Sequence, residues 1–170
     1  MKNEWEEKLD VFFDLAKKLN KKFSVIPLLQ GSLGLKMLVD GDFNPGDIDI
    51  ALPQHLYRLN ERWNDLLSFM LKEGYVLTNL HEHYFVKGEI EVNFAAIDGV
   101  GGIPSLEVFT GIDLMEIPIM ETDGAIYKLM TLEQYYKVYS MSLEDSYRAD
   151  EKGHKDQNKI DILKKALNYN

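Results

Sequence analysis

The sequence contains no cysteine among its 170 residues. A disulfide framework and a thiolate-zinc site are therefore both excluded. The sequence also lacks any apolar run approaching the roughly 20 residues that a membrane-spanning helix needs. The first segment, from Met1 to Lys8, is too acidic and too poor in apolar side chains for a secretory signal. From these absences we expect a cytoplasmic protein with no membrane partner.

Positive charge is scarce, because 19 Lys and Arg residues are set against 28 Asp and Glu residues, which gives a formal net charge of −9. Binding a large nucleic acid through its backbone requires a continuous basic surface, so we expect no partner of this class. A nucleotide is not excluded. A bound Mg²⁺ can carry the opposing charge, and an acidic site is what holds the metal.

The hydrophobic pattern predicts an α/β (α+β) domain, with a small mixed sheet of about five strands flanked by helices and a C-terminal helical tail. The length suits a single domain over residues 1–170, with the sheet in about 1–125 and the C-terminal helices in about 126–170. A hairpin turn is expected near Lys87-Gly88. The segment 106–130 has weak periodicity and is expected to form short strands and turns.

Individual elements follow from periodicity and from capping signals. We expect strands over 23–30, 47–52, 75–79, 84–87 and 89–96. We expect helices over about 5–19, 33–39, 53–74, 131–147 and 155–167. Pro27 would place the first strand near a sheet edge or a bulge.

The most informative segment is the predicted strand that ends in Gly31-Ser32 and leads into a short helix. Backbone N–H groups and a hydroxyl at the start of a helix can bind phosphate, and a glycine lets phosphate oxygens approach the backbone closely. After fourteen intervening residues, Asp47 and Asp49 lie two apart on another predicted strand, so their carboxylates project from one face. Such a pair suits Mg²⁺ or Mn²⁺. Asp-x-Asp also occurs on solvated strand edges, but the order of these features favours a metal and phosphate site.

The run Leu29-Gln30-Gly31-Ser32, followed by Asp47-Ile48-Asp49-Ile50, resembles the signature of the DNA polymerase beta-like nucleotidyltransferase superfamily, in particular its minimal and antibiotic-modifying bacterial members. The resemblance implies an enzyme that transfers a nucleoside monophosphate from a nucleoside triphosphate, such as ATP, to a hydroxyl group. The acceptor would be an antibiotic-like small molecule or a protein. The two aspartates would hold Mg²⁺ or Mn²⁺, and the Gly-Ser pair would hold phosphates.

The resemblance also implies a third carboxylate on a later strand, which would act as metal ligand and general base. Glu91 is the main candidate and Glu89 the second, and both share a predicted strand face with Asn93. An exposed hairpin face is the alternative interpretation for either glutamate.

The C-terminal end adds a weaker resemblance. Arg148, Lys155-Asp156 and the run from Ile160 to Leu163 are similar to the ending of several antibiotic-modifying members. The alternative for Lys155-Asp156 is a polar helix start. His81 and His83 alternate and could clamp a metal, although with no third ligand nearby in sequence they are better interpreted as surface histidines.

Two further hypotheses stay open at this stage. The same fold could act as a non-catalytic binding or regulatory module, because fold alone does not determine function. A chain this short also has little room for its own acceptor-binding domain, so a homodimer could complete the pocket.

Overall fold

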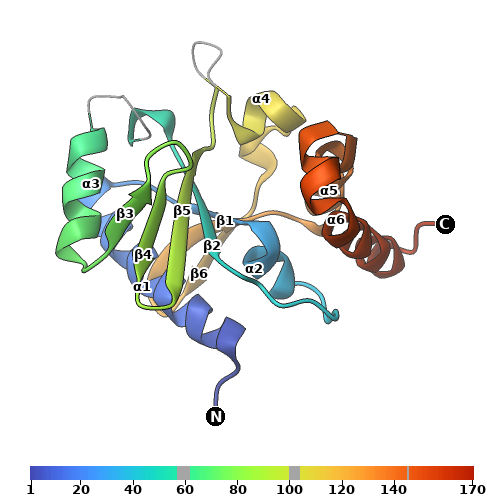
Figure 1. Cartoon of the computed structure of the whole chain (residues 1–170), viewed down its shortest axis with the longest axis horizontal. Coiled ribbons are helices and arrows are strands. Elements are labelled where there is room, and N and C mark those ends of the chain that lie inside the picture. The colour runs from blue at the N-terminus through green and yellow to red at the C-terminus, as the bar shows by residue number, and fades with distance from the viewer. Residues whose placement is uncertain (57–61, 100–103, 145) are drawn as a thin grey trace.

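The computed structural model describes residues 1–56, 62–99, 104–144 and 146–170, with side chains from residue 155 onward in the last of these ranges. Arg148 therefore lies outside the described side chains. The described strands form one mixed sheet in the order β3-β4-β5-β2-β1-β7-β6 (Figure 1). They are β1 (Leu28–Gln30), β2 (Ile48–Leu52), β3 (Val76–Asn79), β4 (Tyr84–Lys87), β5 (Ile90–Ala96), β6 (Ile119–Thr122) and β7 (Ala125–Leu129).

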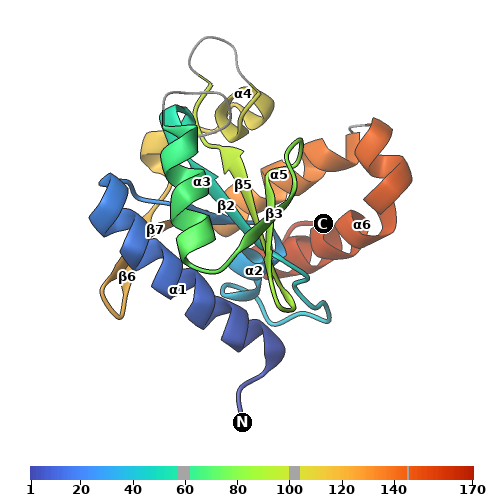
Figure 2. The same ribbon diagram turned by 60° about the vertical axis from the view of Figure 1, so that its left-hand side comes forward.

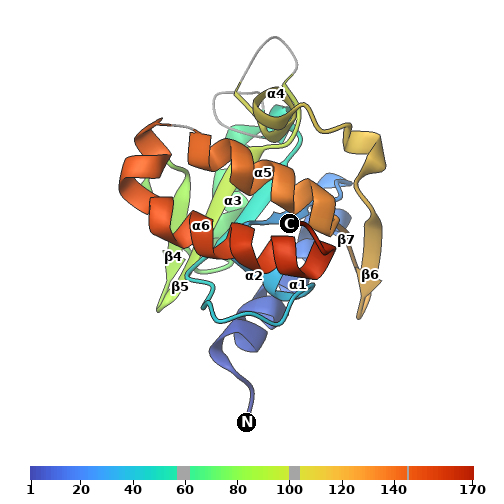
Figure 3. The same ribbon diagram turned by 90° about the vertical axis from the view of Figure 1, so that its right-hand side faces the viewer.

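Helices flank this sheet, which confirms the predicted α/β class. The described helices are α1 (Glu4–Phe23), α2 (Gly31–Lys36), α3 (Trp63–Lys72), α4 (Leu106–Thr110), α5 (Leu132–Glu144) and α6 (Ser146–Leu167). Helices α1 and α3 cover one face of the sheet (Figure 2), and α5 and α6 lie across the opposite face (Figure 3). No helix in the described part of the chain is long and apolar enough to cross a membrane.

The sheet has seven strands rather than about five, because β6 and β7 arise from the weakly periodic segment 106–130. Strand β6 shows no clear alternation because it is an edge strand whose residues are largely exposed, whereas β7 alternates in burial. The sheet consequently extends to Leu129, past the boundary expected near residue 125. The same segment also contains α4, whose start is capped by the Ser105 hydroxyl accepting from the Val108 N–H at 3.1 Å.

The edge position expected for the first strand is wrong, because β1 lies between β2 and β7. Pro27 precedes β1 rather than interrupting it, so its missing N–H is not needed for the ladder. Its carbonyl instead accepts a hydrogen bond from the Lys128 N–H. Strand β1 pairs antiparallel with β2 and parallel with β7, and β2 pairs parallel with β5. The residues at the end of β1 therefore lie beside those at the start of β2.

Two helix predictions also need correction. The segment 53–74 is not one helix: a 3-10 turn covers Gln54–Leu56, and α3 begins at Trp63 after a turn residue, with 57–61 outside the described residues. Helix α6 begins at Ser146, so it runs through the turn expected before residue 155. The predicted hairpin turn at Lys87-Gly88 is confirmed, with Lys87 paired to Ile90.

Helix α5 is fixed to the sheet by its first turns. A capping box opens this helix at Thr131: its N–H donates to Gln134 Oε1 at 3.0 Å, and its hydroxyl accepts from the Gln134 N–H at 3.2 Å. One turn later the fully buried Tyr135 hydroxyl donates to the Leu29 carbonyl at 3.2 Å. A Cβ on Gly34 would lie 2.0 Å from that hydroxyl, so the glycine leaves the space that the tyrosine fills. This contact holds the C-terminal helices over the end of β1.

Candidate functional site

Two carboxylates converge where β2 begins. The register of β2 and β5 sets Asp49 beside Asn93. The Asn93 side-chain nitrogen donates to Asp47 Oδ2 at 2.6 Å and to Asp49 Oδ1 at 3.1 Å. Asp47 and Asp49, called the aspartate pair below, therefore lie on one face and point toward one place. Their charges repel each other, and in this arrangement the amide hydrogens of Asn93 offset part of that repulsion.

Gly31 lies directly against the aspartate pair. Gln30 is the register partner of Asp49, and the next residue, Gly31, has a φ of +69°. A Cβ placed on Gly31 would lie 2.2 Å from Asp49 Oδ2, which no real side chain tolerates. Position 31 therefore needs glycine for two reasons: the left-handed backbone and the close approach of a carboxylate.

A cavity of about 1130 Å³, called the main cavity, opens in front of these residues. Its walls come from the ends of β1, β2 and β5, from β4, and from α5 and α6, so segments far apart in sequence meet there. All the predicted site residues of the first motif line it: Gly31, Ser32, Asp47 and Asp49.

The predicted third carboxylate is close to the pair without touching it. Ile48 pairs with Val92, so the parallel register places Glu91 beside Asp47. Glu91 and the second candidate Glu89 both line the main cavity as exposed side chains. In the described part of the chain, no three His, Asp or Glu side chains are close enough to hold a metal by themselves.

Asn93 is the site residue to which sequence reasoning assigned no role. Strand alternation places Glu89, Glu91 and Asn93 on one face, but the register against β2 decides which of them contacts the aspartates. That register joins segments more than forty residues apart, so no local signal identifies Asn93.

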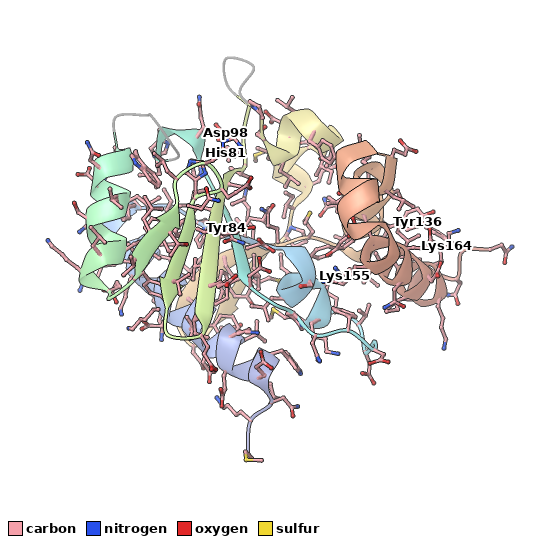
Figure 4. All side chains as sticks on the ribbon, in the orientation of Figure 1. His81, Tyr84, Asp98, Tyr136, Lys155 and Lys164 are labelled. Carbon is pink, nitrogen blue, oxygen red and sulfur yellow. The ribbon has the colours of Figure 1, made fainter. Side chains whose placement is uncertain are left out.

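Tyr84 on β4 lies near several acidic side chains of the main cavity, and Figure 4 shows its place on the sheet. Burial raises the pKa of its hydroxyl, and the charges of Asp47, Asp49, Glu82 and Glu91 raise it further. The β4–β5 side of the main cavity is therefore negatively charged. We call Glu82, Glu89 and Glu91 the acidic wall.

The opposite side of the main cavity carries lysines from α6. Lys155 is exposed, and Figure 4 shows it over the α2 side of the site. Lys159 is half-buried, with its ammonium 5.1 Å from the ring centre of Tyr139. Between them Asp156 is buried, at 1% exposure, and also lines the cavity. The interpretation of Lys155-Asp156 as a polar helix start is therefore wrong, because α6 begins earlier and presents both residues to the cavity.

The two histidines differ. His81 is exposed, as expected of a surface histidine. His83 is buried, with its ring 5.4 Å from that of Trp63 in an edge-to-face contact. Its positive φ of 54° turns the chain at this point, and the surface interpretation fails for this residue.

One relative matches nearly the whole chain. The uncharacterized protein YnaI of Bacillus subtilis (strain 168) is 42% identical over 156 residues, which cover 92% of this chain and 95% of the relative. The chain therefore belongs to the same protein family as YnaI. No family model matches the sequence, and no solved structure matches the chain.

Proposed function

We propose that this member of the YnaI family is a metal-dependent nucleotidyltransferase, which transfers a nucleoside monophosphate from a nucleoside triphosphate to an acceptor hydroxyl. The observation that supports this most directly is the convergence of Asp47 and Asp49 on one point beside the backbone of Gly31. Carboxylates in that position suit a divalent cation that bridges the protein and a phosphate.

The donor set fits Mg²⁺ or Mn²⁺. Mg²⁺ commonly binds through one or two carboxylates and takes its other ligands from water and substrate phosphates, so a third protein carboxylate is not required. The side-chain oxygen of Asn93 is buried and accepts no hydrogen bond from the described residues. Rotation of this amide would turn that oxygen toward the aspartate pair as a further ligand. When bound, the metal would lower the pKa of the attacking hydroxyl and offset charge on the leaving group.

The opposite charges on the two sides of the main cavity indicate where the phosphates and the acceptor would bind. The α6 lysines, Lys155 and Lys159, suit the β- and γ-phosphates, together with Gly31 and Ser32. The acceptor then approaches from the acidic wall, on the other side of the aspartate pair. Glu91 accepts the hydroxyl proton. The acceptor oxygen forms a bond to the α-phosphorus, the bond from that phosphorus to the β-phosphate oxygen breaks, and pyrophosphate leaves toward α6.

The acidic wall favours a small acceptor that carries positive charge, such as an amine-bearing, antibiotic-like compound, or a basic segment of a protein. The cytoplasmic location expected from the sequence would give the protein access to nucleoside triphosphates. A homodimer that completes the acceptor side is a further part of this proposal.

A second candidate function is a non-catalytic nucleotide-binding or regulatory module. One observation favours it: the side chain that contacts the aspartate pair is an amide, Asn93, whereas Glu91 remains exposed. Such a module would bind a metal-nucleotide without releasing pyrophosphate to any acceptor.

Thermal denaturation with each nucleoside triphosphate, with and without Mg²⁺ or Mn²⁺, tests the site. Ligand at 100 times its Kd stabilises the folded state by about 2.7 kcal/mol. For a chain of this size we expect a rise in Tm of roughly 5–10 °C. Asp49→Asn should abolish the metal-dependent rise, whereas Asp65→Asn, at an exposed position on α3, should preserve it.

No rise with any nucleotide would reject nucleotide binding. A rise in Tm without pyrophosphate release across a panel of amine-bearing hydroxyl compounds and basic peptides would favour the module.

A further inference from the structure

A second hollow of about 340 Å³, called the side pocket, opens from the main cavity beside Gly31 and Asp49. It extends under α4 and against α5, which lie together on the side of the sheet beyond the end of β5 (Figure 1). Any molecule whose phosphate lies at the aspartate pair can therefore extend into this pocket without leaving the site.

The lining of the side pocket differs from that of the main cavity. Its walls include Leu106 and Phe109 from α4, and Val138 and Tyr139 from α5. Among its described lining residues, Asp49 is the only charged side chain. Beyond Asp49 at its mouth, the pocket therefore suits a neutral, largely apolar or aromatic group, and it holds no cationic side chain for a phosphate.

Two hydroxyls face this apolar lining. Ser142 is buried, at 5% exposure. It lines both the side pocket and the main cavity. Ser105 accepts from the Val108 N–H, which leaves its own O–H available as a donor. Both serines can therefore offer a hydroxyl to a ligand in the pocket.

We propose that the side pocket binds the nucleobase of the nucleoside triphosphate; this inference rests on the proposed function. The α6 lysines suit the leaving phosphates, and the acidic wall suits a cationic acceptor. The nucleoside is the neutral part of the substrate, and the side pocket is the neutral region next to Asp49. An aromatic base buries its faces against Phe109 and the other apolar walls.

The lining also determines which bases are distinguished. A serine hydroxyl both donates and accepts, so it satisfies the amino group of adenine and the carbonyl of guanine equally. The pocket therefore selects by size and stacking: purines bind more tightly than pyrimidines, and adenine and guanine bind about equally. A larger ring buries more apolar surface against the same walls.

Calorimetric titration in Mg²⁺ tests this with ATP, GTP, CTP, UTP and inorganic tripolyphosphate, which lacks a base. For the wild type we expect ATP and GTP to bind within about threefold of each other, and CTP and UTP about fivefold more weakly, as expected from the area of one extra ring. Val138→Trp fills the side pocket and should weaken ATP binding at least about tenfold, while tripolyphosphate changes less than about twofold. Val108→Trp is the matched control, because Val108 is exposed on α4 and does not line the pocket.

Phe109→Ala gives a second test that does not depend on inserting a large side chain, since Phe109 is 41% exposed and its removal should leave the fold intact. It should weaken ATP at least about fivefold and leave tripolyphosphate unchanged. ATP binding that is unaffected by both Val138→Trp and Phe109→Ala would overturn the nucleobase assignment and point to the acceptor as occupant. Pyrimidines binding as tightly as purines would overturn selection by size. A wild type that binds neither ATP nor tripolyphosphate would instead reject the proposed function itself.

Discussion

Replacing Gly31 by alanine tests how closely the backbone approaches the aspartate pair. Gly31 and Gly88 have similar positive φ angles, +69° and +60°. A Cβ on Gly31 would lie 2.2 Å from Asp49 Oδ2, whereas a Cβ on Gly88, in the β4–β5 turn, meets nothing within 4 Å. Gly88→Ala therefore carries the backbone strain alone, and Gly31→Ala carries the strain together with displacement of Asp49.

The expected magnitudes follow from these contacts. A left-handed alanine costs about 1–2 kcal/mol relative to glycine, so Gly88→Ala should lower the Tm by roughly 2–8 °C. In Gly31→Ala the Asp49 carboxylate must move away, which also disrupts its hydrogen bond from Asn93. A hydrogen bond to a charged group contributes about 1.5–3 kcal/mol. The free energy of unfolding of Gly31→Ala should therefore fall by about 2.5–5 kcal/mol.

Urea denaturation measures these losses, and thermal denaturation with and without Mg²⁺ and ATP measures ligand binding. We expect Gly31→Ala to lose the metal-nucleotide stabilisation and Gly88→Ala to keep it. Equal losses of stability in the two variants, or full ligand stabilisation in Gly31→Ala, would refute the inference that Gly31 is needed for the close approach of Asp49.

Three further predictions concern the packing around the site. Gly34→Ala should destabilise the protein strongly, and Tyr135→Phe should cost about 1 kcal/mol for the lost hydrogen bond. The phenylalanine removes the oxygen that the new Cβ would meet. In a double-mutant cycle the double variant should therefore lose less stability than the sum of the two single losses. Losses that simply add would contradict a contact between position 34 and the Tyr135 hydroxyl. Asn93→Asp should lower the Tm in the absence of metal, because the new carboxylate is repelled by the aspartate pair. Thermal denaturation with chelator and with Mg²⁺ should show that Mg²⁺ raises the Tm of this variant more than that of the wild type. An equal rise in the two proteins would contradict this prediction. Burial raises the pKa of Tyr135 well above 10.0, so above about pH 10 the unfolded chain loses this proton first and stability falls as the pH rises. Urea denaturation from pH 8 upward should show this fall, and a slope that is unchanged in Tyr135→Phe would assign it to other groups.

Several features could be predicted from the sequence because they depend on neighbours along the chain. The Gly31-Ser32 turn, the alternation of Asp47 and Asp49, and the capping box at Thr131 each involve residues at most three apart. The prediction that Lys155 and Asp156 belong with the site came from a resemblance, and the structure places both in the main cavity. Helix α4 was missed because its five residues are too few to show a period.

The sequence by itself determined local features: an acidic strand that follows a Gly-Ser turn, and a helix that opens at Thr131. Only the tertiary structure decided which residues meet. The register of β2 against β5 places Asn93 in contact with the aspartate pair. The packing of Tyr135 against Gly34 determines where α5 and α6 cross the site. The physical reason is that local structure depends on side-chain spacing and backbone preference, whereas register and helix docking depend on packing between segments distant in the chain.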